Sequence, residues 1–158
     1  MFRPIRRTKR EISKEAAKSL LHHERRGVLA VNGEDGYPYA VPLNFYYEEE
    51  TNRIYFHGAK AGYKAEAIQH CDKVCFTIYG NETIKKEAWA PYVQSAIVFG
   101  CCRKMEDRTE SMEKLRKLSG KYYPEESLIE EEIEKSGKAV QMYVIEIEHL
   151  SGKEIQER

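Results

Sequence analysis

Two short segments of this chain combine residue types that could bind a ligand. The first, Gly36–Tyr47, is an apolar, strand-like run interrupted by a proline and an asparagine. Strand alternation places Pro42 and Asn44 on the face opposite the core-facing Val41 and Leu43. A proline removes a ladder donor, which a sheet tolerates at an edge or beside something other than a strand. The Asn44 amide can both donate and accept hydrogen bonds, which suits the carbonyl and N–H edge of a ring such as a flavin pyrimidine. The alternative interpretation is a solvated asparagine at a barrel edge.

The second segment, His57–Lys64, follows the next strand-like run. A symmetric hairpin between the two runs would place His57 nearly opposite Asn44, with Tyr55 and His57 both pointing outward. A structural histidine at a strand end is the competing interpretation. Small residues at 58 and 59 would let a ligand approach the backbone before a helix begins near residue 61.

Lysines flank this predicted helix start, where acidic residues are normally preferred. Lys60 and Lys64 oppose the positive end of the helix dipole, and a bound phosphate dianion would remove the conflict. An ordinary pair of solvated lysines is the alternative. We therefore predict that the two segments form two walls of one cleft for a phosphate-bearing aromatic cofactor.

The elements that must position these walls follow from the hydrophobic pattern. Alternating apolar residues predict six strands at 27–32, 38–47, 53–58, 73–79, 89–104 and 140–150. Helices are predicted after the capping residue Ser13 and at 61–70, 107–120 and 125–135, where Leu128 and Ile133 are the candidates for burial. The polar stretch 80–87 is predicted to be a mobile linker. This order favours a mainly β fold with flanking helices, built on a six-stranded antiparallel barrel.

Composition limits the domain organisation and the partners. The 158 residues carry 26 basic and 26 acidic side chains, so they predict a single domain without strong attraction to nucleic acid or membranes. We expect residues 1–10 to form a solvated basic arm and residues 151–158 a polar tail. The chain lacks a long apolar run and the centre of a signal peptide, which favours a cytoplasmic protein.

The cysteines give no pattern that requires a metal. Cys71, Cys75, Cys101 and Cys102 contain no C-x-x-C pair, and we interpret them as reduced thiols. A zinc site built from Cys71, Cys75 and His70 is conceivable, but the spacing is wrong for a zinc knuckle. We therefore predict no metal site.

Taken in order, the motifs resemble a known family. They are V-P-L-N at 41–44, H-G-A at 57–59 followed by a glycine and lysine opening a helix, K-V-C-F at 73–76, Y-x-x-S at 92–95 and F-G at 99–100. This order resembles the FMN-binding split-barrel flavoproteins, in the branch related to nitroimidazole-resistance proteins and to pyridoxamine 5'-phosphate oxidase. The resemblance covers residues 3–150. It implies a six-stranded split barrel that forms a homodimer, with two FMN sites at the subunit interface.

The resemblance also implies which residues bind the cofactor. The isoalloxazine ring would lie on Val41, Pro42, Leu43 and Asn44, and the phosphate on His57, Gly58, Ala59 and Lys64. A second subunit would complete the site with Trp89, Tyr92 and Ser95. Tyr63 stands where many relatives carry a basic residue, and Lys60 would compensate for that loss.

The function that follows is an FMN-dependent oxidoreductase acting on a small molecule. His57 or Tyr46 could donate a proton, but no acid–base pair stands out and the catalytic residue is unknown. The tail after residue 150 lacks the arginine pattern of a vitamin B6 oxidase. Two alternatives stay open: a haem-binding split barrel with His149 or His57 as axial ligand, and a flavin carrier without catalysis.

Overall fold

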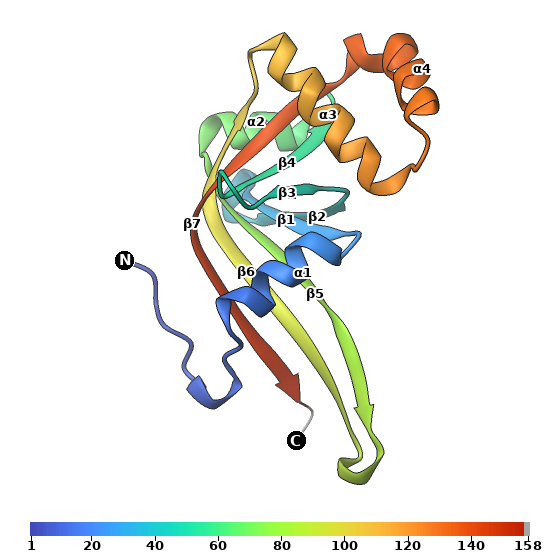
Figure 1. The fold of residues 1–158 in the computed structure, drawn as a ribbon. Helices are drawn as coiled ribbons and strands as arrows, with labels where there is room; N and C mark the ends of the chain where they lie inside the picture. The colour runs from blue at the N-terminus through green and yellow to red at the C-terminus, as the bar shows by residue number, and fades with distance from the viewer. Residues whose placement is uncertain (157–158) are drawn as a thin grey trace.

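The fold of the chain is an antiparallel sheet flanked by helices, seen in a computed structural model that describes residues 1–156 (Figure 1). The helices are α1 (Lys14–His23), α2 (Tyr63–His70), α3 (Arg108–Tyr122) and α4 (Glu126–Ser136). Short 3₁₀ turns occupy Thr8–Arg10, Glu34–Gly36, Lys86–Ala88 and Gly137–Ala139. The strands are β1 (Gly27–Asn32), β2 (Pro38–Leu43), β3 (Tyr46–Glu48), β4 (Arg53–Gly58), β5 (Lys73–Lys85), β6 (Ala90–Lys104) and β7 (Gln141–Gln156).

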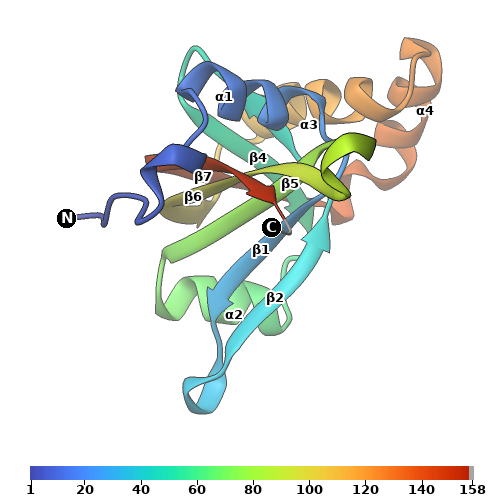
Figure 2. The same cartoon turned by 90° about the horizontal axis from the view of Figure 1, so that it is seen from below.

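All seven strands belong to one sheet in the order β2-β1-β5-β6-β7-β4-β3. The sheet curls on itself, and Figure 2 shows α1 and α3 on one side of it and α2 on the other. The two edge strands are consecutive in the chain, because β2 leads directly into β3. The predicted mainly β, antiparallel barrel class is confirmed.

The strand count differs from the six that we predicted, because the expected strand 38–47 is divided. Its first half, β2, pairs with β1, with Val41 opposite Leu29, and its second half, β3, pairs with β4, with Tyr46 opposite Tyr55. Asn44 and Phe45 lie between the halves and outside either strand. The expected hairpin between 38–47 and 53–58 is therefore limited to β3 and β4.

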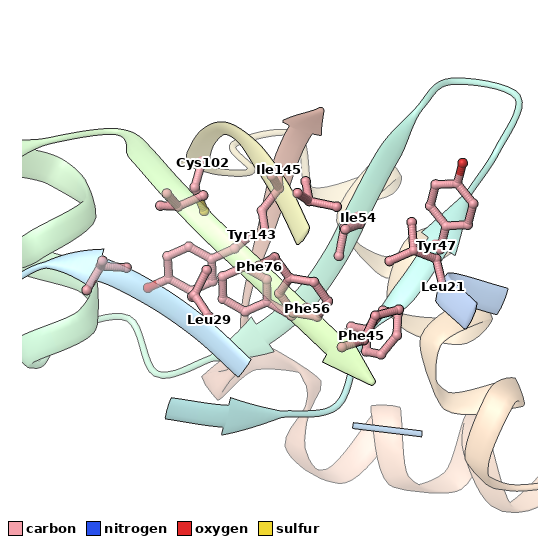
Figure 3. Close-up of a cluster of buried hydrophobic side chains, with 14 of the residues drawn as sticks. Leu21, Leu29, Phe45, Tyr47, Ile54, Phe56, Phe76, Cys102, Tyr143 and Ile145 are labelled. Atoms are coloured by element: carbon pink, nitrogen blue, oxygen red, sulfur yellow. The ribbon is translucent and has the colours of Figure 1, made fainter. Parts of the chain in front are cut away.

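The core fills the inside of the curled sheet (Figure 3). Phe56 stacks on Tyr143 with ring centroids 5.0 Å apart, and Phe45 packs edge-on against Phe76 at 4.9 Å. Val41 and Leu43 pack against this core, as their alternation predicted. Helix α1 adds Ala17, Leu20 and Leu21, and its Ser13 cap accepts a hydrogen bond from the Ala16 N–H at 3.1 Å.

A second apolar cluster lies between α3 and the outer face of β4 and β7. It contains Tyr55, Met105, Leu115, Leu118, Met142 and Val144. Tyr55 points away from the inner core, as we predicted, but its side chain is completely buried because α3 covers this face of β4. Because Tyr143 and Ile145 belong to the inner core and Met142 and Val144 to this second cluster, β7 lies between two layers.

The stretch 80–87 is not a mobile linker, because β5 continues to Lys85 and β6 begins at Ala90. Thr83 pairs with Tyr92, and Tyr92 pairs in turn with Gln156 of β7. Residues 151–156 are therefore strand rather than polar tail, and residues 157–158 of that predicted tail lie outside the described part. Backbone pairing, which does not depend on apolar side chains, builds an arm that projects from the barrel (Figure 1).

Three further expectations need adjustment. Helix α3 runs past Gly120 to Tyr122, and the buried residue of α4 is Ile129 rather than Leu128, which is exposed. The basic arm is not wholly solvated, because Phe2 stacks on the rings of His149 and Phe99 at 4.8 and 5.6 Å. None of the helices within residues 1–156 is long and apolar enough to span a bilayer.

Candidate functional site

The first wall of the candidate site is the end of β2. Pro42 is exposed and paired with Val28 of β1, while Asn44 is half-buried just beyond the strand. Among the described residues β2 is the outermost strand on its side of the sheet, so no other described strand lies along its outer edge. Pro42 thus occupies an edge, where its missing N–H is tolerated. This edge could accept a planar ligand along the backbone of residues 41–44.

The break between β2 and β3 is held by side chains from the end of α3. The Tyr122 hydroxyl accepts a hydrogen bond from the Phe45 N–H at 3.0 Å and lies 3.1 Å from the Phe45 carbonyl oxygen. Lys121 donates from Nζ to that same oxygen at 3.1 Å and lies 3.6 Å from the centre of the Phe45 ring. Tyr122 and Lys121 thus satisfy the backbone groups of Phe45, which leave the ladder, and hold the chain directly after Asn44.

The second wall is the turn between β4 and α2. The Tyr143 hydroxyl donates to the Ala59 carbonyl oxygen at 2.9 Å, and Lys104 donates from Nζ to the Lys60 carbonyl oxygen at 2.7 Å. Gly62 then adopts φ 125°, a conformation that side-chain-bearing residues rarely adopt, and α2 begins there without a side-chain cap. Uncapped N–H groups at a helix start can receive an anion.

Lys64 is half-buried in this wall, whereas Lys60 is exposed. Its Nζ lies 5.5 Å from the Phe56 ring centre, and a Cβ added at Gly58 would lie 3.1 Å from it. Burial lowers the pKa of Lys64. Within residues 1–156, no carboxylate lies within 4.0 Å of this ammonium. Lys64 is therefore suited to an anion supplied from outside the chain.

His57 does not lie opposite Asn44 as we predicted, because the β3–β4 ladder ends at the pair Tyr46 and Tyr55. Its strand partner is Met142 of β7. Its ring lines a groove of about 670 Å³ beneath α3 and α4, with Leu115, Tyr123, Ile129 and Ile133 among the other lining residues. Burial, and to a lesser degree the charge of Lys64, lower the pKa of His57, which favours the neutral imidazole.

Tyr63, at the position where a basic residue was expected, has a structural role. Its hydroxyl accepts a hydrogen bond from the Glu34 N–H at 2.7 Å, and its ring lies 4.6 Å from that of Tyr39. These contacts attach α2 to the β1–β2 hairpin. The predicted substitute, Lys60, is exposed on the same turn as Lys64, with its carbonyl fixed by Lys104.

The three residues predicted to come from a second subunit, Trp89, Tyr92 and Ser95, lie on the projecting arm. They do not meet the two walls within one chain. Trp89 is 84% exposed with φ 49° at the arm's turn, and Tyr92 lies beneath Lys85 Nζ at 3.9 Å. Ser95 is buried and donates to the Lys153 carbonyl oxygen at 3.5 Å. Figure 1 shows the turn of this arm at the opposite end of the molecule from α2.

The cysteines are free thiols, as we expected. Burial raises the pKa of Cys102 to about 12, and the hydrogen bond that Cys101 donates to Glu148 at 2.8 Å raises the pKa of Cys101 to about 11. Both are therefore protonated and weakly nucleophilic at neutral pH. Across the described residues, no three His, Cys, Asp or Glu side chains are arranged to hold a metal ion.

The curled antiparallel sheet, which stays open between its edge strands β2 and β3, defines a split-barrel protein. The sequence model of the pyridoxamine 5'-phosphate oxidase family matches residues 13–154, so the chain belongs to that family. No curated protein matches the sequence significantly.

Solved structures with the same fold share little sequence with this chain. A Bacteroides thetaiotaomicron protein assigned to 5-nitroimidazole antibiotic resistance is 21% identical over 92% of this chain and 87% of its own, with a TM-score of 0.78. An FAD-binding protein from Mesorhizobium loti is 22% identical over 92% and 97%, with a TM-score of 0.65. An FAD- and haem-binding protein from Mycobacterium smegmatis is 18% identical over 92% and 72%, with a TM-score of 0.71.

Proposed function

We propose that this protein binds FMN and acts as an FMN-dependent oxidoreductase on a small molecule. One observation carries the proposal: Lys64 is half-buried, has no carboxylate within 4.0 Å among the described residues, and is the second residue of α2, whose start has no side-chain cap. A phosphate group would satisfy both features. The family match and the flavin-binding proteins among the structural neighbours support a flavin as the source of that phosphate.

The ring of the cofactor would lie along the exposed edge at Val41–Asn44, with the phosphate near His57–Ala59, Lys60 and Lys64. Tyr39 contacts Tyr63 at the helix end of this path, and Asn44 is five residues further along. At roughly 3.3 Å per residue the path is about 17 Å long, which is sufficient for an extended FMN. When bound, a flavin supplies hydride and electron transfer. The protein binds and orients the ring and excludes water from one face.

A second copy of the chain would complete the site. The arm that carries Trp89, Tyr92 and Ser95 lies away from both walls of its own chain, and Trp89 is almost fully exposed. An arm of this kind can reach the walls of a neighbouring subunit in a symmetric dimer. We therefore propose a homodimer with the flavin at the interface. The four reduced thiols fit a cytoplasmic location.

The first experiment is to record the absorption spectrum of the purified protein. We expect a flavin spectrum, and FMN released on heating. The double variant His57→Ala/Lys64→Ala should lower flavin occupancy at limiting FMN while the melting temperature of the flavin-free protein stays near that of wild type. The matched control is His70→Ala/Lys138→Ala, which removes the same two residue types from exposed positions. Equal occupancy in both double variants would refute the assignment.

Haem is the second candidate cofactor, favoured by the groove beside His57. The lining of this groove includes Leu115, Ile129 and Ile133 from α3 and α4, beside charged residues of α4, and a histidine on an apolar wall could ligate haem iron. The other candidate ligand, His149, is stacked on Phe2. A Soret band on addition of haem, lost in His57→Ala, would favour this candidate over FMN. Turnover of a nitroaromatic compound with reduced nicotinamide would separate an enzyme from a flavin carrier.

A further inference from the structure

Three cationic side chains surround one aromatic ring at the break between β2 and β3. The guanidinium carbons of Arg25 and Arg26 lie 4.9 and 5.6 Å from the centre of the Tyr122 ring, and Lys121 Nζ lies 5.6 Å from it. The arginines come from the turn between α1 and β1, and Lys121 comes from the last turn of α3. We call these three residues the cationic cluster.

Among the described residues, no carboxylate forms an ion pair with the cationic cluster. Other basic residues form ion pairs, for example Arg53 with Glu146 at 3.2 Å, but within residues 1–156 none of the three has a carboxylate oxygen within 4.0 Å. The Glu24 carboxylate is directed against Gly80, where a Cβ would collide with it, so Glu24 opposes the charge of the arginines at Lys121 without forming an ion pair. Burial and then the charge of Arg25 lower the pKa of Lys121 to about 8.

Contacts within the protein account for only part of this arrangement. The Tyr122 ring face and the C-terminal end of α3 each attract positive charge weakly. Lys121 donates to the Phe45 carbonyl oxygen, and Arg26 donates to the Arg25 carbonyl oxygen at 3.1 Å. All of these partners are neutral groups. The chain as a whole carries no net charge, yet these three basic side chains lie together without an ion pair. Such a cluster is suited to a multivalent anion.

We propose that Arg25, Arg26 and Lys121 bind the carboxylate or phosphate group of a small-molecule ligand. Two exposed guanidinium groups can each donate two parallel hydrogen bonds to such an oxyanion. The ammonium of Lys121, fixed on Phe45, supplies a third charge.

The position of the cationic cluster makes this ligand a partner of the cofactor. Lys121 is fixed on Phe45, next to Asn44 at one end of the proposed cofactor path, whereas Tyr63, the neighbour of Lys64, contacts Tyr39 at the other end. The two anion sites are thus separate, at opposite ends of the cofactor path. The assignment of the anion to a substrate rests on the proposed function; the anion site itself does not.

Calorimetric titration of flavin-free protein with inorganic phosphate and with succinate, at constant ionic strength, tests the site directly. We expect saturable binding of at least one of them, weakened about tenfold or more in Arg25→Gln/Arg26→Gln. The control Arg116→Gln/Lys135→Gln removes the same charge from residues paired with Glu130 and Glu131, and should bind like wild type. No saturable binding, or an equal loss in both double variants, would overturn the proposal.

Titration with FMN and with riboflavin identifies the source of the anion. If the ligand is distinct from the cofactor, Arg25→Gln/Arg26→Gln leaves both flavin affinities unchanged. A loss of FMN affinity without a loss of riboflavin affinity would place the flavin phosphate in the cationic cluster and overturn the assignment to a second ligand. Saturable anion binding by a protein that binds no flavin would refute the proposed function and leave the anion site standing.

Discussion

The hydroxyl of Tyr122 occupies the place of a strand partner for Phe45. It accepts from the Phe45 N–H at 3.0 Å and can donate to the Arg25 carbonyl oxygen at 2.7 Å or to the Phe45 carbonyl oxygen at 3.1 Å. One side chain thus links the start of β1, the break after β2 and the end of α3. The edge that carries Pro42 and Asn44 can leave the ladder because this phenol replaces the missing backbone partner.

Tyr122→Phe should therefore destabilise the protein. The Phe45 N–H lies beside a fully buried side chain, and loss of its acceptor should lower the free energy of unfolding by about 1–3 kcal/mol. Urea unfolding of flavin-free protein measures this loss. Tyr123→Phe is the matched control, since Tyr123 is 62% exposed. Equal stability of the two variants would show that the hydroxyl does not hold the break.

Lys121 should make the stability of the protein depend on alkaline pH. Its pKa is lowered to about 8 by burial, whereas an unfolded lysine has a pKa near 10.4. Between these values the unfolded chain binds more protons, so the free energy of unfolding should rise with pH from about 8 to about 10.4. Lys121→Met should lack this rise, and Lys138→Met, at an exposed position, should keep it. Urea unfolding across this pH range measures the difference.

The sequence predicted the parts of this region that follow a local pattern. Alternation placed Val41 and Leu43 against the core, and a helix was expected to begin near residue 61, where α2 begins at Tyr63. The anion expected from Lys60 and Lys64 stays a prediction. The helix at 107–120 was predicted to end at Gly120, so Lys121 and Tyr122 fell outside every predicted element. Their contacts with Phe45 join residues more than 70 positions apart in the sequence, and a local sequence pattern cannot predict such a contact.

The same limit explains the errors in strand length. The polar segment around Thr83 and the last residues before Gln156 have no apolar alternation, although their backbones pair in the sheet. Tyr55 alternated correctly with Phe56, but burial of the outer face depends on α3, which comes 50 positions later. The alternation of apolar residues assigns each side chain to one of the two faces of a strand. It does not predict which element packs on each face.

The ion pair between Glu48 and Lys114 should contribute to attachment of α3 to β3. Lys114 donates from Nζ to Glu48 at 2.7 Å, and both residues are buried. Lys114→Met leaves Glu48 buried without its main partner and should cost about 2–4 kcal/mol of unfolding free energy. Glu48→Gln/Lys114→Met should cost less than that single change, since it removes the uncompensated charge. A larger loss in the double variant would contradict this account.

The Glu48 carboxyl also predicts a response to acid. Burial acts to raise its pKa, but the hydrogen bonds from Lys114 and Thr51 outweigh burial and lower it. A carboxyl with a lowered pKa stabilises the folded state above its unfolded pKa, and that stability is lost as pH falls through the folded value. Unfolding free energies measured down the acid range should therefore decline more steeply in wild type than in Glu48→Gln/Lys114→Met.

His57 should titrate below the usual range of histidine in flavin-free protein. Burial is the main cause of its lowered pKa and the charge of Lys64 is the second, so Lys64→Met should raise the value while leaving it depressed. Nuclear magnetic resonance of the imidazole signals measures both values. The His57 pKa is lower in the folded than in the unfolded chain, so on acidification the unfolded chain takes up this proton at higher pH and is stabilised. Wild type should therefore lose more stability than His57→Gln as pH falls below about 6.5. An unchanged His57 pKa in Lys64→Met would show that the two charges do not interact.

The proposed dimer predicts complementation between two defective chains. Trp89→Ala and Lys64→Ala should each lower flavin affinity, because each removes one side of both shared sites. In a mixed dimer with one chain of each variant, one site keeps both residues and the other loses both. After co-refolding of equal amounts, random pairing gives about half mixed dimers, so about a quarter of all sites should bind flavin as wild type does. Titration with FMN measures this fraction. If Trp89 and Lys64 of the same chain formed each site, mixing would restore none.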